Sequence, residues 1–238
     1  MKIKYLLKKI HRKMIKVLVG NLYVPADQLN IFVQAAIHSV SLKGDYLEFG
    51  VYNGTSFTNA YFAFRKADIQ VRERWNYISD QPRMFAFDSF AGLPEIKTVD
   101  INGPFKKGDY ACTESVFLDN LKNNGVDLNA VITVKGFYNE TLTDMTRKTH
   151  YIEKARIIHI DCDLYESAKQ VLEFVTPLIQ EGTIIIFDDW FQFHGNPDRG
   201  EACAFREWLA LNKQFNAVEF MRRPPWSNSF IMSYKLDA

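Results

Sequence analysis

Residues 155–190 read ARIIHIDCDLYESAKQVLEFVTPLIQEGTIIIFDDW, and this stretch decides the fold. Two apolar runs rich in β-branched residues, 157–160 and 183–187, are each followed by acids. Between them, apolar residues recur on one helical face, so the pattern predicts strand, helix and strand. Such a βαβ unit makes its two strands parallel. The residues after both strands then meet at the carboxyl edge of one sheet, where open α/β folds bind their ligands.

The aspartates after these two strands have two interpretations. As ligands of a divalent metal ion, Asp161, Asp188 and Asp189 offer the hard oxygen atoms that Mg²⁺ prefers. As structural residues, acids after buried strands often cap the next helix, and Asp163 is placed to cap a helix beginning near Tyr165. An adjacent acidic pair is costly to gather unless a cation or a hydrogen-bond network compensates it. The spacing alone leaves both interpretations open.

Strand and helix patterns alternate along the rest of the chain. The expected strands are 45–49, 83–87, 130–134, 157–160, 183–187, 215–220 and 230–234. The expected helices include 25–42, 55–66, 113–123 and 201–211, with 67–82 as a surface connection. This alternation predicts an α/β fold with a doubly wound, mostly parallel seven-stranded sheet whose last strand pair is antiparallel. Residues 1–43 are predicted to be a helical extension, and residues 44–238 the main domain.

Charge and cysteine content narrow the class of protein. The net charge of +1 gives no electrostatic signature for nucleic acid. Three cysteines without CxxC spacing argue against a disulfide framework or a zinc cluster, which favours the reducing cytoplasm. No apolar run is long enough to cross a membrane, and lysines interrupt the amino terminus where a secretory signal would be apolar.

The first 20 residues differ from the rest, because they carry seven basic residues and no acid. Apolar residues recur at helical spacing over residues 3–18, which predicts a basic amphipathic helix. We expect it to pack on the body or on a second subunit of a homo-oligomer. Peripheral contact with an anionic membrane is the alternative, and it would be weak for one short helix without an acyl chain.

A glycine turn follows the first predicted strand. Glu48-Phe-Gly-Val-Tyr-Asn-Gly54 has two glycines four residues apart and lacks the middle spacing of GxGxxG, so it fits a dinucleotide pyrophosphate poorly. A helix beginning at this turn presents main-chain N–H groups to a ligand. Asp88, at the end of the second strand, is placed to accept hydrogen bonds from two ribose hydroxyls. Together they indicate a nucleoside ligand without phosphates.

These segments carry a resemblance to a known family. Residues 47–54 resemble the first motif of class I S-adenosylmethionine-dependent methyltransferases. Residues 87–94, 105–111, 135–142, 159–166 and 188–190 resemble, in the same order, the macrocin and mycinamicin sugar O-methyltransferases. The recognised match runs from about residue 45 to 212, and the first 40 residues carry no part of it.

The resemblance implies a site and a reaction. It implies a Rossmann-like methyltransferase fold that binds S-adenosylmethionine and Mg²⁺ and methylates a hydroxyl of a sugar or glycosylated product. The implied cofactor-binding residues are Glu48, Gly50, Tyr52, Gly54, Thr55, Ser56, Asp88, Ser89, Gly136 and Phe137. The implied metal ligands are Asp161, Asp188 and Asp189. With a methyl donor expected at the same sheet edge, metal ligation becomes the favoured interpretation of these three acids. Asp163 is expected either to cap the helix or to contact the metal ligands without binding the ion itself.

The reaction needs an ionised hydroxyl, which a sugar does not supply at neutral pH. A metal ion on that oxygen stabilises the alkoxide and orients it, so Asp161 is also predicted to be catalytic. Related catechol-type enzymes have a lysine as base three residues after the first metal aspartate, where this chain has Leu164. His194 is therefore the predicted proton acceptor, with Asp163 as the alternative. Trp190, Phe191, Phe193 and Trp226 could stack on a sugar or belong to the core.

Two other functions remain compatible with the sequence. One is a metal-independent class I methyltransferase of another small molecule. The other is a non-catalytic nucleoside-binding partner in polysaccharide assembly.

Overall fold

The computed structural model describes residues 30–76 and 80–236. The helix predicted over residues 3–18 lies outside the described part of the chain, as does the start of the helix predicted over 25–42. The described part of the latter is α2, Ile31–His38, which begins after the cap residue Asn30. No helix in the described ranges is long and apolar enough to cross a membrane.

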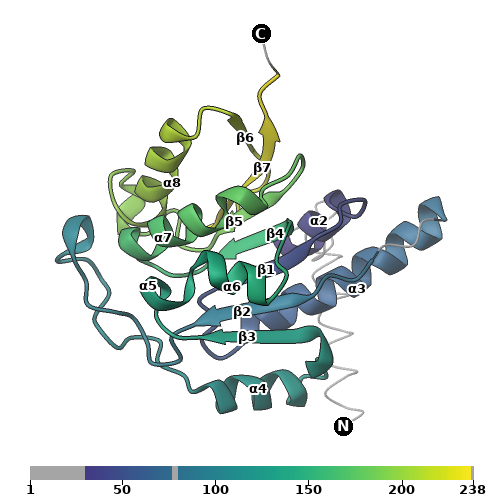
Figure 1. The fold of residues 1–238 in the computed structure, drawn as a ribbon, viewed down its shortest axis with the longest axis horizontal. Helices are drawn as coiled ribbons and strands as arrows, with labels where there is room; N and C mark the ends of the chain where they lie inside the picture. Colours follow the sequence, from purple (N-terminus) through teal and green to yellow (C-terminus); the bar gives the residue numbers. More distant parts are fainter. Residues whose placement is uncertain (1–29, 77–79, 237–238) are drawn as a thin grey trace, which may run out of the picture.

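Seven strands form one sheet in the order β3-β2-β1-β4-β5-β7-β6 (Figure 1). They are β1 Asp45–Phe49, β2 Met84–Asp88, β3 Val131–Lys135, β4 Ala155–Ile160, β5 Ile184–Phe187, β6 Phe215–Glu219 and β7 Asn228–Tyr234. The first five are parallel, and β7 runs antiparallel to both β5 and β6. The predicted sheet is therefore confirmed, including the antiparallel last pair. The carboxyl ends of the five parallel strands meet along one edge.

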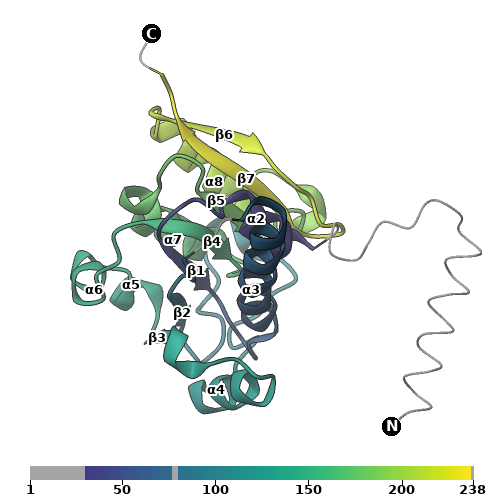
Figure 2. The ribbon, with the colours of Figure 1, turned by 90° about the vertical axis from the view of Figure 1, so that its right-hand side faces the viewer.

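Helices cover both faces of the sheet (Figure 2). On one face α2, α3 Thr55–Trp75 and α4 Glu114–Asn123 pack on the side chains that alternate strand positions direct to them. On the other face lie α5 Tyr138–Thr141, α6 Asp144–Thr149, α7 Tyr165–Val175 and α8 Gly200–Leu211. Strands β1, β4 and β5 are buried along their whole length, as expected of strands covered on both faces.

The prediction that residues 67–82 form a surface connection is wrong over its first half. Helix α3 continues to Trp75, because Ala67 and Val71 lie four residues apart on one face of the helix and both are buried. An ion pair between Arg72 and Asp68 on the solvent side supports this last part of the helix. The polar composition of the segment concealed a narrow apolar stripe.

A buried acid, Asp100, anchors the long loop after β2. Its Oδ2 accepts a hydrogen bond from the N–H of Tyr165 at 2.6 Å, and its Oδ1 accepts one from the N–H of Gly200 at 2.9 Å. Both donors are the first residues of helices, α7 and α8, whose initial N–H groups lack partners within the helix. Asp100 therefore caps two helices at once and holds the loop against their starts.

Replacing Asp100 with alanine leaves two buried helix-start N–H groups without partners. We expect Asp100→Ala to lower the free energy of unfolding by about 2 kcal/mol. For a chain of this size that corresponds to a fall in Tm of roughly 4–8 °C, measurable by thermal unfolding followed by circular dichroism.

Asp109 supplies a matched control in the same loop, because it accepts only from the exposed N–H of Lys106, at 2.7 Å. Asp109→Ala should shift Tm by less than half as much. Equal shifts for the two variants would contradict the role assigned to Asp100.

Candidate active site

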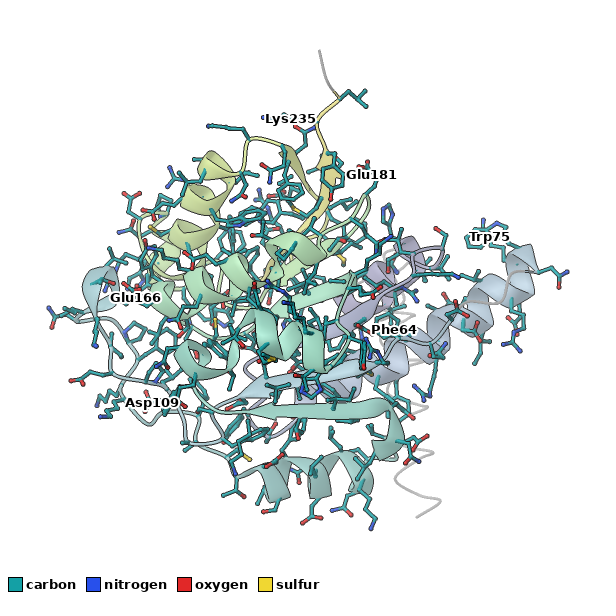
Figure 3. All side chains as sticks on the ribbon, viewed as in Figure 1. Phe64, Trp75, Asp109, Glu166, Glu181 and Lys235 are labelled. Atoms are coloured by element: carbon teal, nitrogen blue, oxygen red, sulfur yellow. The ribbon has the colours of Figure 1, made fainter. Side chains whose placement is uncertain are left out.

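A cavity of about 370 Å³ opens along the carboxyl edge of the sheet. Its lining follows the strand order: Phe137 after β3, Asp88 at the end of β2, Gly50 after β1, Asp161 after β4, and Asp188 after β5. The rest of the wall comes from loops and from α5 and α7, and comprises Tyr52, Ser89, Gly92, Leu93, Pro94, Tyr110, Tyr138, Asn139, Cys162, Asp163, Ser167, Gln170, Asp189, Gln192 and Trp226. Figure 3 shows Glu166, at the start of α7, and Asp109, in the loop after β2, on the side where the parallel strands end.

The turn after β1 passes directly over the end of β4. Gly50 has φ +87°, and a Cβ built on it would lie 1.7 Å from the carbonyl oxygen of Asp161. No side chain fits there, so only glycine allows the two main chains to pass at this distance. This close approach brings the predicted cofactor turn and the first predicted metal ligand to one place.

Asp88 ties the turns after β1 and β2 together. Its Oδ2 accepts hydrogen bonds from the N–H groups of Val51 at 2.8 Å and Tyr52 at 3.2 Å, and its Oδ1 accepts from Phe90 N–H at 2.7 Å. A carboxylate can accept about four hydrogen bonds. Asp88 therefore keeps capacity for one further donor in the cavity that it lines, fewer than the two ribose hydroxyls expected from the sequence.

The other predicted cofactor residues divide into two groups. Gly50, Tyr52, Asp88, Ser89 and Phe137 line the cavity. Glu48, Gly54, Thr55, Ser56 and Gly136 do not.

The residues that do not line the cavity contact other parts of the protein instead. Glu48 is buried beneath the turn and accepts hydrogen bonds from Tyr46 Oη and, at 2.5 Å, from Ser56 Oγ. Gly54 is the residue before α3 and adopts φ +84°, and Gly136 adopts φ +140° against Thr141. Their contribution to cofactor binding remains a prediction.

Four acids gather at the β4 and β5 end of the cavity: Asp161, Asp163, Asp188 and Asp189. Burial, and then repulsion by Asp188, raises the pKa of Asp161 well above its ordinary value. Burial and Asp189 do the same to the pKa of Asp163, and burial with Asp188 raises the pKa of Asp189 to about 6. Gathered without a cation, these carboxylates oppose each other's ionisation.

Asp188 is the exception, because it has polar and basic neighbours. Burial alone would raise its pKa, but His159, a hydrogen bond from Ser227 Oγ at 2.9 Å, and Arg223 together lower it. The guanidinium Nη1 of Arg223 lies 3.8 Å from its Oδ1.

His159 lies inside β4, beneath the cavity, and is fully buried. Its Nδ1 is 3.6 Å from Glu48 Oε1, and its Nε2 is 3.8 Å from Asp188 Oδ1, so neither nitrogen makes a hydrogen bond within the described part of the chain. Burial alone would lower its pKa, but these acids hold the pKa well above the ordinary value for histidine. Glu48, His159 and Asp161 bring one ligand atom each within 4.8 Å of one another, which makes them a second set that could hold a cation.

Glu201 positions the acid segments, and nothing in the sequence analysis identified it. This buried residue in the first turn of α8 accepts hydrogen bonds from the N–H groups of Cys162 and Asp189, both at 3.1 Å. One carboxylate thus links the segment after β4 to the segment after β5. An acid in an otherwise apolar helix start, GEACAF, was the available signal.

Two predicted roles do not match the positions of their residues. Asp163 does not cap α7: it adopts φ +63°, its carboxyl is one of the groups that shift the pKa of Asp189, and Asp100 accepts from the N–H that Asp163 was expected to cap. His194 is exposed in the turn Phe193–Gly195 and is not part of the cavity wall. Of the four candidate aromatic residues, only Trp226 lines the cavity, whereas Trp190 packs against the core.

Comparison with known proteins agrees with this site. A sequence model of the family described as macrocin-O-methyltransferase (TylF) matches residues 26–221. The match begins well before residue 45, so the expectation that the first 40 residues carry no part of it is wrong. Among curated protein sequences, none matches the chain significantly.

Several solved structures share the fold. The O-methyltransferase NovP is 19% identical, with a TM-score of 0.67 over 86% of this chain and 79% of NovP. The calicheamicin methyltransferase CalS11 is 23% identical, with a TM-score of 0.62 over 94% of this chain and 91% of CalS11. An O-methyltransferase from Bacillus cereus in complex with SAH is 14% identical, with a TM-score of 0.54 over 96% of this chain and 90% of that one.

The matched segment contains the whole cavity edge, from Gly50 to the acids after β5, and the sheet is that of the O-methyltransferases above. The chain therefore belongs to the macrocin O-methyltransferase (TylF) family and is an S-adenosylmethionine-dependent O-methyltransferase.

Proposed function

We propose that the chain transfers the methyl group of S-adenosylmethionine to a hydroxyl of a sugar, in a glycosylated natural product or a polysaccharide precursor, with Mg²⁺ held by Asp161, Asp188 and Asp189. The observation that carries the proposal is the order of groups along one cavity. The glycine turn and Asp88 lie at the carboxyl ends of β1 and β2, and the acids lie at the carboxyl ends of β4 and β5. A methyl donor bound over the first pair has its sulfonium next to the acids.

The acceptor class rests on one relative and on the cavity wall. One CalS11 structure is described as that of a TDP-rhamnose 3'-O-methyltransferase of calicheamicin biosynthesis. In this chain, the exposed rings of Tyr52, Tyr110 and Trp226 line the cavity near the acids. Aromatic faces of this kind suit the apolar face of a sugar.

The acids fit a magnesium ion by chemistry and by charge. All three offer only oxygen, which is what Mg²⁺ prefers. Burial and mutual repulsion raise the pKa values of Asp161 and Asp189, and a bound cation relieves that repulsion. When bound, the ion would supply Lewis-acid stabilisation of the substrate alkoxide.

The residues of the chain then divide the remaining work. Glu201 holds the two acid segments at a fixed separation through the N–H groups of Cys162 and Asp189. Asp163 lines the cavity beside Asp189, so it is better placed than the exposed His194 to receive the proton of the acceptor hydroxyl. The three cysteines, all free, suit a protein of the reducing cytoplasm, and a homo-oligomer remains part of the proposal.

A metal-independent methyltransferase is the second candidate, and one observation favours it. His159, Ser227 and Arg223 already compensate Asp188, and together they lower the pKa of that acid without any metal. If these groups compensate the acids well enough for the site to work without a metal ion, methyl transfer would persist in EDTA.

A thermal shift separates the two candidates. The fold raises the pKa of Asp161, so this residue costs stability at pH 8, which lies well above the ordinary pKa of an aspartate in the unfolded chain. Asp161→Asn should therefore raise Tm in EDTA by roughly 2–4 °C, equivalent to about 1 kcal/mol. The wild-type protein should gain stability on addition of MgCl₂, because an ion that binds only the folded state stabilises it. Asp161→Asn should lose that gain.

Asp198 provides the control, as an exposed acid paired only with Arg206. Asp198→Asn should keep both the EDTA value of Tm and the magnesium response. If neither MgCl₂ nor EDTA changes the Tm and the turnover of the wild-type protein, the magnesium proposal is contradicted and the metal-independent enzyme is supported.

The proton acceptor can be identified by turnover at saturating Mg²⁺ and cofactor. Asp163→Asn should lower kcat by roughly 100-fold or more, the usual contribution of a positioned base, with a smaller effect on cofactor affinity. His194→Ala should retain nearly normal kcat, because His194 lies outside the cavity wall. The reverse ranking would return the role to His194.

A further inference from the structure

The two carboxyl oxygens of Asp188 have different surroundings. Oδ1 accepts a hydrogen bond from Ser227 Oγ at 2.9 Å. An ionised carboxylate has no proton to give, so the serine hydroxyl is the donor. We propose that Ser227 is a positioning residue, which turns Asp188 so that its Oδ2 faces the divalent ion. This inference rests on the proposed function, because it assigns Ser227 a role toward the magnesium ion of that proposal.

Three side chains that compensate Asp188 approach the same oxygen, Oδ1. Ser227 bonds it, and His159 Nε2 and Arg223 Nη1 each lie 3.8 Å from it. Oδ2 makes no hydrogen bond within the described part of the chain, and it is not among the buried atoms left without a partner there. Asp188 lines the cavity and its side chain is 32% exposed, so Oδ2 is the oxygen open to a ligand.

The strand register brings Ser227 to this position. Strand β7 runs antiparallel to β5, and its first residue, Asn228, lies opposite Phe187. The residue before Asn228 therefore lies beside the residue after Phe187, which is Asp188. Ser227 is only 3% exposed, so its bond to Asp188 is shielded from water.

The turn that carries Ser227 is bonded to itself and to the acid segment. The N–H of Arg223 donates to the carbonyl oxygen of Ser227 at 2.9 Å, and the N–H of Ser227 donates back at 3.0 Å. The carbonyl oxygen of Trp226 accepts from the N–H of Phe191, three residues after Asp188, at 2.8 Å. These bonds hold the Ser227 hydroxyl against Asp188. The turn lies beyond residue 221, where the match to the family model ends.

A carboxylate held in this way binds an ion more tightly than a free one. A side chain that already has its binding orientation loses less conformational freedom when the ion arrives. Groups that hydrogen-bond to metal ligands typically change the affinity for the metal by roughly 10- to 100-fold when they are removed. The Ser227 hydroxyl should therefore contribute to metal affinity without touching the ion.

Titration calorimetry with MnCl₂ on the full chain, without substrate, measures this contribution. Ser227→Ala should raise the Kd for Mn²⁺ by roughly 10-fold or more. Ser227→Thr keeps a hydroxyl donor and should retain most of the wild-type affinity. Asp161→Asn removes a proposed ligand and should bind Mn²⁺ least, which assigns the measured ion to this site.

Ser229→Ala is the matched control. Ser229 is another buried serine, two residues further along the chain, and its hydroxyl donates to the carbonyl oxygen of Met221 at 2.8 Å. Both alanine variants lose a buried hydroxyl and should show similar falls in Tm, but only Ser227→Ala should lose affinity for Mn²⁺. Unfolded protein lowers the fitted stoichiometry rather than the affinity, so partial unfolding does not imitate the effect.

The outcomes separate this inference from the proposal beneath it. A wild-type protein that binds no Mn²⁺ would overturn the magnesium proposal and this inference together. If the wild-type protein binds Mn²⁺, the role of Ser227 alone is overturned when Ser227→Ala binds the ion equally tightly, or when Ser229→Ala loses as much affinity as Ser227→Ala.

Discussion

The active-site edge depends on the close crossing of two main chains, the turn after β1 and the end of β4. The N–H of Asp161 donates to the carbonyl oxygen of Phe49 at 2.9 Å. Gly50 in turn lies so close to the carbonyl oxygen of Asp161 that no side chain fits at position 50. Because β1 and β4 are parallel neighbours, everything that follows them emerges at one level. The turn proposed to bind the methyl donor and the acids proposed to face the acceptor are thus adjacent, although they lie more than 100 residues apart. A bulkier residue at position 50 would separate them.

The acids of the cavity destabilise one another, and two further buried acids hold the backbone around them. Asp100 and Glu201, both buried, spend their oxygens on main-chain N–H groups at the starts of α7 and α8 and of the acid segments. They fix the backbone of the acid segments through main-chain N–H groups, without using the carboxylates of Asp161 and Asp189. Raised pKa values at these two residues are the cost of gathering the acids at one place. The cofactor half carries no such crowding, because Asp88 has main-chain donors around it.

The sequence predicts the elements that local pattern determines. Strand β1 is predicted to the residue, and β5 within one, because buried parallel strands are apolar runs with punctuation at both ends. The end of α3 was missed, since two buried residues in a charged segment give a weak periodic signal. The acids of the site were found because they directly follow strands. Asp100 and Glu201 were not, because the N–H groups that they bind lie 65 and 100 residues away for Asp100, and 39 and 12 for Glu201.

The role of Asp163 also depends on a residue that is distant in the sequence. A cap was the reasonable local interpretation, but the N–H in question was taken by a residue from another loop, which left the carboxyl of Asp163 for the cavity. Similarly, the position of His194 five residues after Asp189 suggested a place in the site, yet the turn Phe193–Gly195 leaves it exposed, while Phe193 is buried. Sequence distance from a catalytic residue is a poor guide within a loop.

The central claim is that one edge holds the methyl donor over β3, β2 and β1 and a divalent ion over β4 and β5. A crystal structure with S-adenosylhomocysteine and Mn²⁺, whose anomalous signal locates the ion, tests it most directly. The account predicts adenine beside Phe137, ribose at Asp88, and the ion among Asp161, Asp188 and Asp189. An ion bound elsewhere, or a ribose away from Asp88, would contradict it.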